Sequence, residues 1–410
     1  MSIQQNFPAI SPSLSLNFAR SKTLDPRITF TRTSSGTRTN ERGLVEVVPA
    51  NSPRFDHSYD PVSGTVRSLG LLVEEQRTNL IPITTNNENG LPITDFNYPM
   101  SGFDENNTEL DIAPDGNLVL CKYNLTGANS PFLNINSTAS ITAGVTYTMS
   151  MWVKGGSSYS ASFAWVNQTT NEVPNTTISI TPEWRRYTFS FTPQFNSTSS
   201  RLQIFFSTQG NDKIISVWGA QLEPGSFATS YIPRPSGQAT RTADNVSMVG
   251  ENFSSWYNPS EGTVYADTRM VGVQTGRYDR LWAITNSNLN LEGISVFVAG
   301  PAGTPSGYVS SVTITNSATE QVGGALVETA LTTPRLKSAF AFKQNDCASA
   351  YNGQQRFVDS IVDLSSFTTP LDRLLIGQPQ RYQGHSCMTI SQLTYYPRRL
   401  TNSNLQNLTK

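Results

Sequence analysis

Aromatic and amide side chains are the residues of this chain whose types and spacing could do chemistry, and that chemistry is sugar binding. The flat face of a ring packs against the C–H face of a pyranose, while amide groups hydrogen-bond to its hydroxyls. The candidate ligand-binding residues fall into two groups, Tyr159, Trp165 and Asn167, then Tyr278, Trp282, Asn286 and Asn288. The alternative is that a tryptophan in a β-protein lies in the core. For Trp152, Trp184 and Trp218, which lie in strand-like stretches, we expect the core.

Residues for hydrolysis are few. The only histidines are His57 and His385, and neither lies near a Gly-x-Ser-x-Gly motif. A Ser-His-Asp triad is assembled in space, so sequence order leaves it open as an alternative.

Glycoside cleavage needs two carboxylates that face one bond. In the segment that begins at Glu261, the nearest candidates are Glu261, Asp267, Asp279 and Glu292, at turn or strand-end positions. We interpret these acids as structural or solvated, and therefore expect no catalytic residues and no enzymatic activity.

Metal ligands are similarly sparse. No His/Cys/Asp cluster has zinc spacing. Asp104–Asn107, and Asp111 near Asp115, offer the oxygen ligands that calcium prefers, so we expect no cofactor but keep a structural calcium as an alternative. The cysteines are three and far apart, and Cys347 could pair with Cys387 only if their strands adjoin.

Composition limits the classes of partner. The 410 residues suffice for two or three domains, and charged residues make up 14%, against about 25% in typical soluble domains. The net charge of −1 provides no broad basic field, so nucleic acid is not expected as a partner. No apolar run approaches the ~20 residues of a membrane span, and we expect no membrane insertion, export signal or anchor.

The elements that would position these side chains are short strands. Apolar and polar residues alternate over 145–154, 183–191 and 202–206, and residues 213–235 read as a closing strand followed by a hinge. A helix is predicted only over 401–408, with Thr401 as its N-cap. The chain is therefore predicted to be all-β.

A set of ordered motifs identifies a family for the N-terminal stretch. LDPRITFTR (24–32), PRFD (53–56), DPVSG (60–64) and GLLVEEQRTNL (70–80) strongly resemble the N-terminal module of structural and adsorption proteins of tailed bacteriophages. The match covers about 60 residues, with one mild departure at 47–51, where an alanine-rich segment is usual. The resemblance implies a virion protein.

The resemblance continues along the chain. Residues 96–233 resemble a jelly roll of the carbohydrate-binding-module type, since the same phage proteins carry the YTxSxWVK, WRRYTFxF and WGAQLEPG motifs. Residues 238–410 resemble a concanavalin-like (laminin-G-like) sandwich, in which the strand from Glu261 pairs with the last strand, 388–396. The expected division is an N-terminal β module at 1–95, then two β-sandwiches at 96–233 and 238–410.

These resemblances imply a non-catalytic virion protein located on the tail or particle surface. The expected role is a tail-associated fibre or appendage that adsorbs to host-surface glycan, as a homo-oligomer in contact with other virion proteins. The chain has no heptads or solenoid repeats, which favours a compact appendage over a long fibre. The alternatives are a capsid-decorating or tail-bracing protein that makes only protein contacts and, third, a glycan depolymerase.

Overall fold

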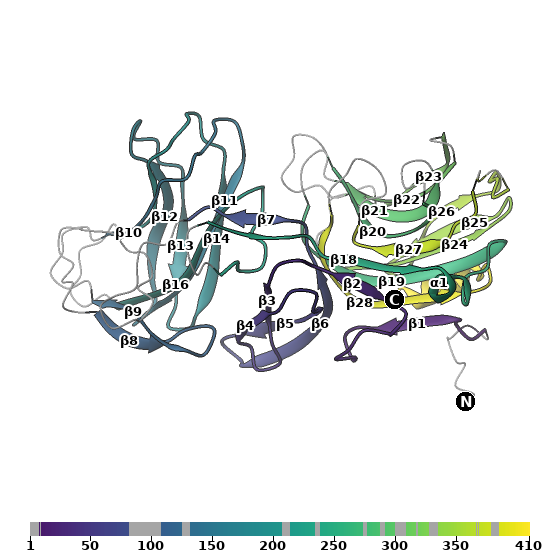
Figure 1. Cartoon of the computed structure of the whole chain (residues 1–410), viewed down its shortest axis with the longest axis horizontal. Coiled ribbons are helices and arrows are strands. Elements are labelled where there is room, and N and C mark those ends of the chain that lie inside the picture. Colours follow the sequence, from purple (N-terminus) through teal and green to yellow (C-terminus); the bar gives the residue numbers. More distant parts are fainter. Residues whose placement is uncertain are drawn as a thin grey trace.

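The computed structural model describes residues 8, 10–81, 108–124, 132–206, 214–233, 238–273, 277–287, 292–299, 309–316, 319–327, 335–365, 367, 369–378 and 385–410. Regular structure within them is almost entirely β-strand, in two sandwiches joined by the N-terminal segment (Figure 1). The prediction of an all-β chain with an N-terminal β module and two sandwiches is confirmed.

The described helices are short. α1 spans Glu251–Ser254 and α2 spans Asn402–Leu408. The Thr401 hydroxyl accepts a hydrogen bond from the Asn404 amide at 3.3 Å, so the predicted C-terminal helix and its N-cap are both present. Within the described residues, no helix is long and apolar enough to cross a membrane.

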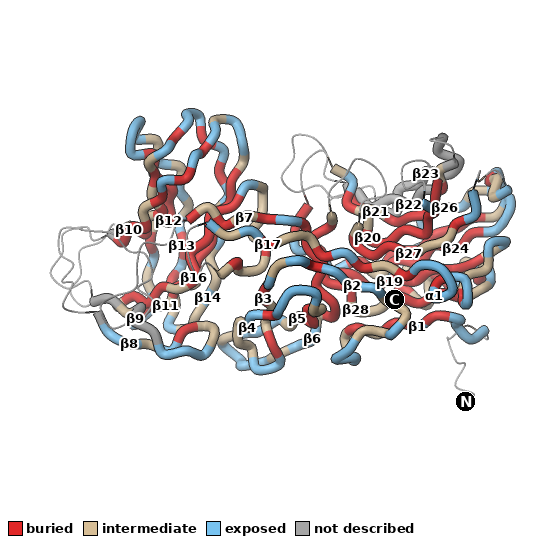
Figure 2. The backbone as a smooth tube through the Cα atoms, in the orientation of Figure 1, coloured by how far each residue is buried: buried red, intermediate tan, exposed pale blue. Residues whose placement is uncertain are grey.

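The middle sandwich is built from nine described strands. They are β8 (Thr108–Ile112), β9 (Leu118–Asn124), β10 (Phe132–Ser137), β11 (Tyr147–Gly155), β12 (Tyr159–Asn167), β13 (Asn175–Ile180), β14 (Arg185–Phe191), β15 (Ser200–Phe205) and β16 (Ile214–Pro224). One sheet has the order β14-β11-β16-β9-β8 and the other β10-β15-β12-β13. Their facing sides bury one hydrophobic core, seen as the buried inner strands of Figure 2.

The C-terminal sandwich uses the later strands of the chain. They are β18 (Asn245–Val249), β19 (Glu261–Gly272), β20 (Tyr278–Thr285), β21 (Gly293–Ala299), β22 (Val309–Asn316), β23 (Thr319–Val327), β24 (Arg335–Lys343), β25 (Cys347–Tyr351), β26 (Gln354–Asp359), β27 (Arg373–Ile376) and β28 (Cys387–Tyr396). A further short strand, β17 (Ala239–Arg241), lies outside these sheets and pairs with residues 77–79. β19 pairs antiparallel with β28, from Thr263 opposite Tyr396 to Gly272 opposite Cys387, as the concanavalin-like resemblance implied.

The N-terminal segment completes this sandwich. Its strands are β1 (Leu14–Asn17), β2 (Thr29–Thr31), β3 (Gly36–Thr39), β4 (Val45–Val48), β5 (Arg54–Asp60), β6 (Thr65–Val73) and β7 (Arg77–Asn79). The described sheets of the sandwich have the orders β26-β25-β24-β19-β28-β6-β5 and β2-β18-β27-β20-β21-β22-β23, with β1 also paired to β28. The predicted N-terminal module is therefore hydrogen-bonded into the C-terminal sandwich.

β28 has two N-terminal partners along one edge. Its first half pairs with β6, from Met388 opposite Val73, and its second half pairs with β1, from Gln392 opposite Asn17. Gly70 lies where β6 departs from β28, with a φ of +95°, and a β-carbon there would lie against the Ile390 carbonyl. The two strands thus lie end to end and cover the edge of β28.

The predicted domain boundaries at 95/96 and 233/238 fall outside the described residues and stay predictions. The cysteine question is decided by sheet order, since β25 and β28 are separated by β24 and β19. Three strand spacings of about 4.8 Å keep Cys347 far from Cys387, and both are free and buried. The two cysteines do not pair.

Candidate functional site

The two tryptophans predicted to bind sugar lie in the cores. Trp165 is fully buried in the middle sandwich and stacks on Phe191, with ring centroids 4.8 Å apart and an interplanar angle of 21°. Trp282 is 1% exposed in the core of the C-terminal sandwich. Neither ring presents a face to solvent, so the prediction that these rings stack on a sugar is wrong.

The predicted amide partners have structural roles. The Asn167 side chain is buried, and its Oδ1 accepts hydrogen bonds from the amides of Thr169 (3.1 Å) and Thr170 (3.4 Å) in the turn after β12. Asn286 is also buried and donates from Nδ2 to Glu292 Oε2 at 2.6 Å. Both amides therefore hold loops in place.

The remaining predicted residues do not form a site either. Tyr159 is half-buried, and its hydroxyl donates to the Ile214 carbonyl at 2.8 Å. Tyr278 is 47% exposed and meets Phe297 edge-on, but the buried Trp282 and Asn286 do not join it at the surface. Asn288 lies outside the described residues.

The tryptophans expected in the core instead lie on the outer face of a sheet. Trp152, Trp184 and Trp218 are each half-buried. On β11, Met151 and Val153 point into the core, so the residue between them must point outward. Trp152 is opposite Trp218 of β16 in the register, which places both rings on the same outward face.

These rings and one tyrosine form a cluster, called here the outer aromatic cluster: Trp152, Trp184, Trp218 and Tyr231. The ring centroids of Trp152 and Trp218 are 5.2 Å apart, and Tyr231 lies 4.8 Å from Trp218 and 5.9 Å from Trp152. Trp184 and Trp218 both pack on Ala113. The indole N–H of Trp184 donates to the Ile112 carbonyl at 2.9 Å, which fixes the ring plane.

Polar groups surround the cluster on the same face. Asp111 accepts hydrogen bonds from Lys154 (2.9 Å) and Ser216 (2.7 Å). Burial alone would raise the pKa of Asp111, but these two hydrogen bonds outweigh it and the pKa is lowered. Lys154 Nζ lies 5.1 Å from the Trp184 ring centroid, and the Arg186 guanidinium lies 4.5 Å from that of Trp152. The sheet face therefore combines flat rings with fixed hydrogen-bonding groups.

A cavity of about 700 Å³, called here the groove, opens beside the cluster. One side is Trp152 and residues 184–187, and the floor is 112–114. The other side, called here the N-terminal wall, comprises Thr39, residues 42–45, Tyr59 and Pro61. The volume falls within the range of about 300–1,000 Å³ typical of ligand sites.

Local contacts hold the N-terminal wall against the middle sandwich. The Val45 amide donates to the Pro114 carbonyl at 2.9 Å. Gly43 has a φ of +79°, and a β-carbon there would collide with the Tyr59 ring, so glycine permits the ring to lie over this turn. Tyr59 is 45% exposed. The groove is thus formed by two segments far apart in sequence.

Two other described cavities are less suited to a sugar. One of about 470 Å³ lies on the β5–β6 hairpin and contains Asp267 and Arg335, whose side chains pair at 2.6 Å, but no tryptophan. The other, of about 170 Å³, is lined by Glu74 and Trp152 among others, where the two sandwiches meet. We take the groove as the candidate site because it alone among these three combines tryptophan rings with an adequate volume.

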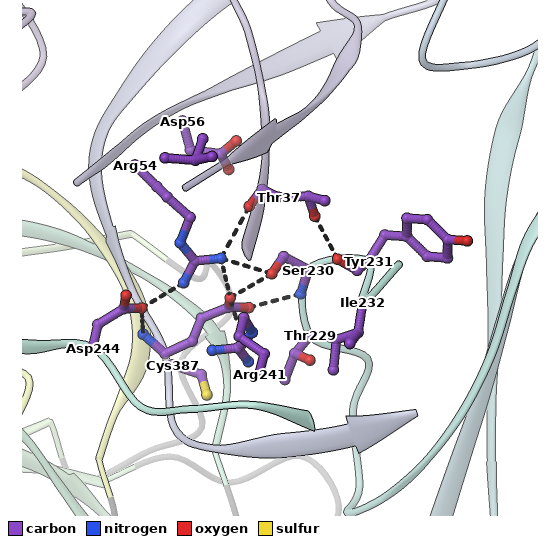
Figure 3. Close-up of polar contacts among 12 residues, drawn as sticks. Thr37, Arg54, Asp56, Thr229, Ser230, Tyr231, Ile232, Arg241, Asp244 and Cys387 are labelled. Atoms are coloured by element: carbon purple, nitrogen blue, oxygen red, sulfur yellow. Dashed lines mark hydrogen bonds and ion pairs between the residues drawn. The ribbon is translucent and has the colours of Figure 1, made fainter. Parts of the chain in front are cut away.

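A buried ion network joins the two sandwiches near the groove. It comprises Arg32, Arg54, Glu74, Arg241 and Asp244, all with side chains at most 1% exposed. Arg54 donates to Glu74 Oε2 at 2.8 Å and also pairs with Asp244 (Figure 3). Arg32 pairs with Asp244 at 3.0 Å. Figure 3 places Arg54 of β5, Arg241 of β17 and Asp244 close together, beside Ser230 of the segment after β16.

The middle sandwich supplies an anchor to this network through Ser230. Its hydroxyl donates to Glu74 Oε2 at 2.6 Å, and its amide donates to Glu74 Oε1 at 2.7 Å. Burial would raise the pKa of Glu74, but Arg241 and Arg54 hold it at about 2. Asp56, half-buried nearby, has its pKa raised to about 6 by burial. The network holds segments together rather than presenting a reactive group to solvent.

The candidate catalytic groups have other partners in the structure. His57 Nδ1 lies 3.1 Å from the Thr39 carbonyl, and His385 Nε2 lies 2.9 Å from Asn245 Oδ1. Burial lowers the pKa of His385. Glu261 accepts from Arg398 at 2.9 Å, and Asp279 pairs with Arg277 at 3.3 Å.

The acids considered as calcium ligands have other partners in the structure. Asp111 pairs with Lys154, and Asp115 accepts from the Asn117 amide at 3.0 Å and its side chain at 2.8 Å. Residues 104–107 lie outside the described part of the chain. Where the structure is described, no three His, Cys, Asp or Glu residues gather as a metal-binding group.

Sequence comparison bears directly on the sandwich that carries the groove. Residues 96–213 match the family described as "Carbohydrate binding domain". This stretch is therefore similar to a carbohydrate-binding domain. No curated protein matches the whole sequence at a significant level.

Solved structures give weaker likenesses. The CBM40 module of the Ruminococcus gnavus IT-sialidase is 12% identical, with a TM-score of 0.31, over 39% of this chain and 88% of that one. A CBM4 module is 15% identical, with a TM-score of 0.25, over 30% of this chain and 92% of that one. The leech intramolecular trans-sialidase is 15% identical, with a TM-score of 0.30, over 37% of this chain. This chain spans 23% of the length of that enzyme.

Proposed function

We propose that this protein is a non-catalytic, glycan-binding component of a bacteriophage particle, a tail-associated fibre or appendage that adsorbs to host-surface glycan. One observation carries the glycan-binding part. The stretch that matches a carbohydrate-binding domain also carries Trp152 and Trp184, which line a 700 Å³ groove on the outer face of its sheet.

The groove fits the way proteins hold sugars. The Trp184 ring is fixed by its hydrogen bond to Ile112 and lines the groove, where it offers a flat surface to a pyranose. A single stacked ring contributes about 0.5–1.5 kcal/mol beyond area burial, so one such site binds at about millimolar Kd. Adhesion then requires many copies, which supports a homo-oligomer repeated on a particle.

The virion part of the proposal rests on the motifs of residues 24–80. The structure gives these motifs a physical role, because Arg32, Arg54 and Glu74 come from three of them and meet in the buried ion network. Motif residues Arg77 and Asn79 are also buried, and Asn79 donates to the Ala220 carbonyl of the middle sandwich at 3.2 Å. The motifs thus specify a joint between sandwiches, which supports treating them as one inherited module.

The second candidate is a capsid-decorating or tail-bracing protein that makes only protein contacts, favoured by the rigid joint. A glycan depolymerase ranks third. A labelled antibody to this protein, imaged on intact particles, separates the first two roles. Label at the tail tip supports adsorption, whereas label over the capsid surface or along the tail supports the structural role.

Replacing Trp184 with alanine is expected to weaken glycan binding about tenfold, because one of the two tryptophan rings that line the groove is removed. The measurement is a glycan array followed by titration of the best ligand with multimerised protein. Tyr278→Ala is the matched control, since Tyr278 is an exposed aromatic residue in the other sandwich and its loss should leave binding unchanged. Equal binding by wild type and Trp184→Ala would place the site elsewhere.

A further inference from the structure

The charged residues that line the groove are all positive. Its lining contains three arginines, Arg42, Arg185 and Arg186, and no aspartate or glutamate. The chain as a whole has a net charge of −1, so this local excess of positive charge does not follow from composition. A cavity lined by one sign of charge concentrates ligands of the opposite sign.

Arg186 is fixed at the inner side of the groove. Its Nη1 donates to the Thr229 carbonyl at 2.7 Å and its Nη2 to Ser150 Oγ at 2.9 Å, while the guanidinium lies on the Trp152 ring. Its Nε is buried and has no hydrogen-bond partner among the described residues. Because this Nε is closed off from solvent and both Nη groups already donate within the protein, Arg186 acts on a ligand in the groove through its positive charge.

The other two arginines stand nearer the rim. Arg185 donates from Nε to Thr181 Oγ1 at 3.1 Å and lies close enough to Asp60 to help lower the pKa of that carboxyl, after Ser63 and Val62. Arg42 is exposed, and within the described residues its guanidinium has no ion pair. The acid next to it in sequence, Glu41, lies 3.9 Å from Arg38 instead. Arg42 therefore keeps its charge available to a ligand.

We infer that the groove takes an acidic glycan, whose anionic substituent is held between Arg42 of the N-terminal wall and Arg186 of the middle sandwich. A guanidinium binds a carboxylate or a phosphate through paired N–H donors, and the neighbouring rings accept the sugar face. The shared chemistry is a pyranose carrying a negative group, either a uronic acid or a phosphate ester. This inference rests on the proposed glycan-binding function. It adds that the preference for an acidic over a neutral glycan depends on Arg42, which lies outside residues 96–213.

The test compares acidic polymers with neutral matches of the same backbone. Polygalacturonate is paired with its carboxyl-reduced form, and a phosphomannan with the corresponding neutral mannan. The full chain, multimerised, is expected to bind at least one acidic polymer at least tenfold more tightly than its neutral match, with the preference shrinking as salt is raised. The pair that shows the preference distinguishes carboxylate from phosphate.

Charge reversal at Arg42 locates the effect. Arg42→Glu should weaken binding to the acidic polymer at least tenfold and reduce the preference for that polymer over its neutral match. Arg20→Glu is the control, because Arg20 is exposed and outside the groove and the substitution makes the same change in net charge. Thermal unfolding of both variants should match wild type.

Four outcomes overturn the inference. Equal binding within both polymer pairs, or equal effects of Arg42→Glu and Arg20→Glu, shows that the arginines do not select charge, while the proposed glycan binding stands. If the protein binds none of the four polymers but does bind neutral glycans on an array, the inference also fails and the proposed glycan binding stands. Absence of binding to any glycan removes the proposed function as well.

Discussion

Replacing Glu74 with glutamine is expected to lower the free energy of unfolding by about 3–5 kcal/mol, the cost of breaking a buried ion pair. Glu74 pairs with Arg54 at 2.8 Å and lies 3.5 Å from Arg241, and both arginines are fully buried. Without this carboxylate, Asp244 is the only remaining acid of the network, against three arginines. Urea unfolding of the full chain measures the change.

Asp56→Asn is the matched control for that substitution. Asp56 is half-buried, and burial raises its pKa to about 6, so its charged form is disfavoured in the folded protein. An asparagine Oδ1 can still accept the hydrogen bond that the Thr39 amide makes at 2.7 Å. We expect Asp56→Asn to leave stability at pH 7 unchanged or to raise it. A Glu74→Gln variant within about 1 kcal/mol of wild type would contradict the role given to the network.

The two carboxyls also make opposite contributions to pH dependence. The folded-state pKa of Glu74 is lowered from 4.5 to about 2, so its stabilisation is present above pH 4.5 and is lost as pH falls toward 2. The loss is on the order of 3 kcal/mol. The raised pKa of Asp56 stabilises the fold below about pH 4, and this contribution is lost as pH rises through 6. Glu74→Gln should remove the first dependence and Asp56→Asn the second.

Trp165→Ala is expected to destabilise the middle sandwich by about 3–5 kcal/mol, because the fully buried ring leaves a cavity beside Phe191. Trp282→Ala should have a similar cost in the C-terminal sandwich, where the ring is 1% exposed. Trp184→Ala, at a half-buried position, should cost less than about 2 kcal/mol. Denaturant unfolding of the three variants checks this order. A Trp184→Ala variant as unstable as Trp165→Ala would mean that Trp184 belongs to the core.

Sequence patterns predicted the strands well but not always which face they bury. On β12, Phe163 and Trp165 are two residues apart and share the inner face. This spacing predicts that Trp165 is buried. On β11, Met149, Met151 and Val153 share the inner face and alternate with polar residues, so the same signal could have placed Trp152 on the outer face. The expectation that Trp152 lies in the core came from its residue type and ignored this alternation.

Local sequence patterns could not predict the contacts that join the two sandwiches. β1 and β6 pair with β28, more than 300 residues away in the chain, and alternation within a strand does not identify its partner. Residue type alone favours a surface position for Arg54 and Glu74, because charged side chains are rarely fully buried unless paired. The family resemblance marked these motifs as specific, but only the structure shows that they meet in one network.

The most direct test of glycan binding in the groove uses the tryptophans themselves as reporters. The chain has six, so protein labelled with 5-fluorotryptophan should give six ¹⁹F resonances, assigned through single Trp→Phe variants. On titration with the best glycan, we predict that the Trp184 and Trp152 resonances shift in a saturable way, while those of the buried Trp165 and Trp282 stay in place. Saturable glycan binding without any shift at Trp184 and Trp152 would contradict the account.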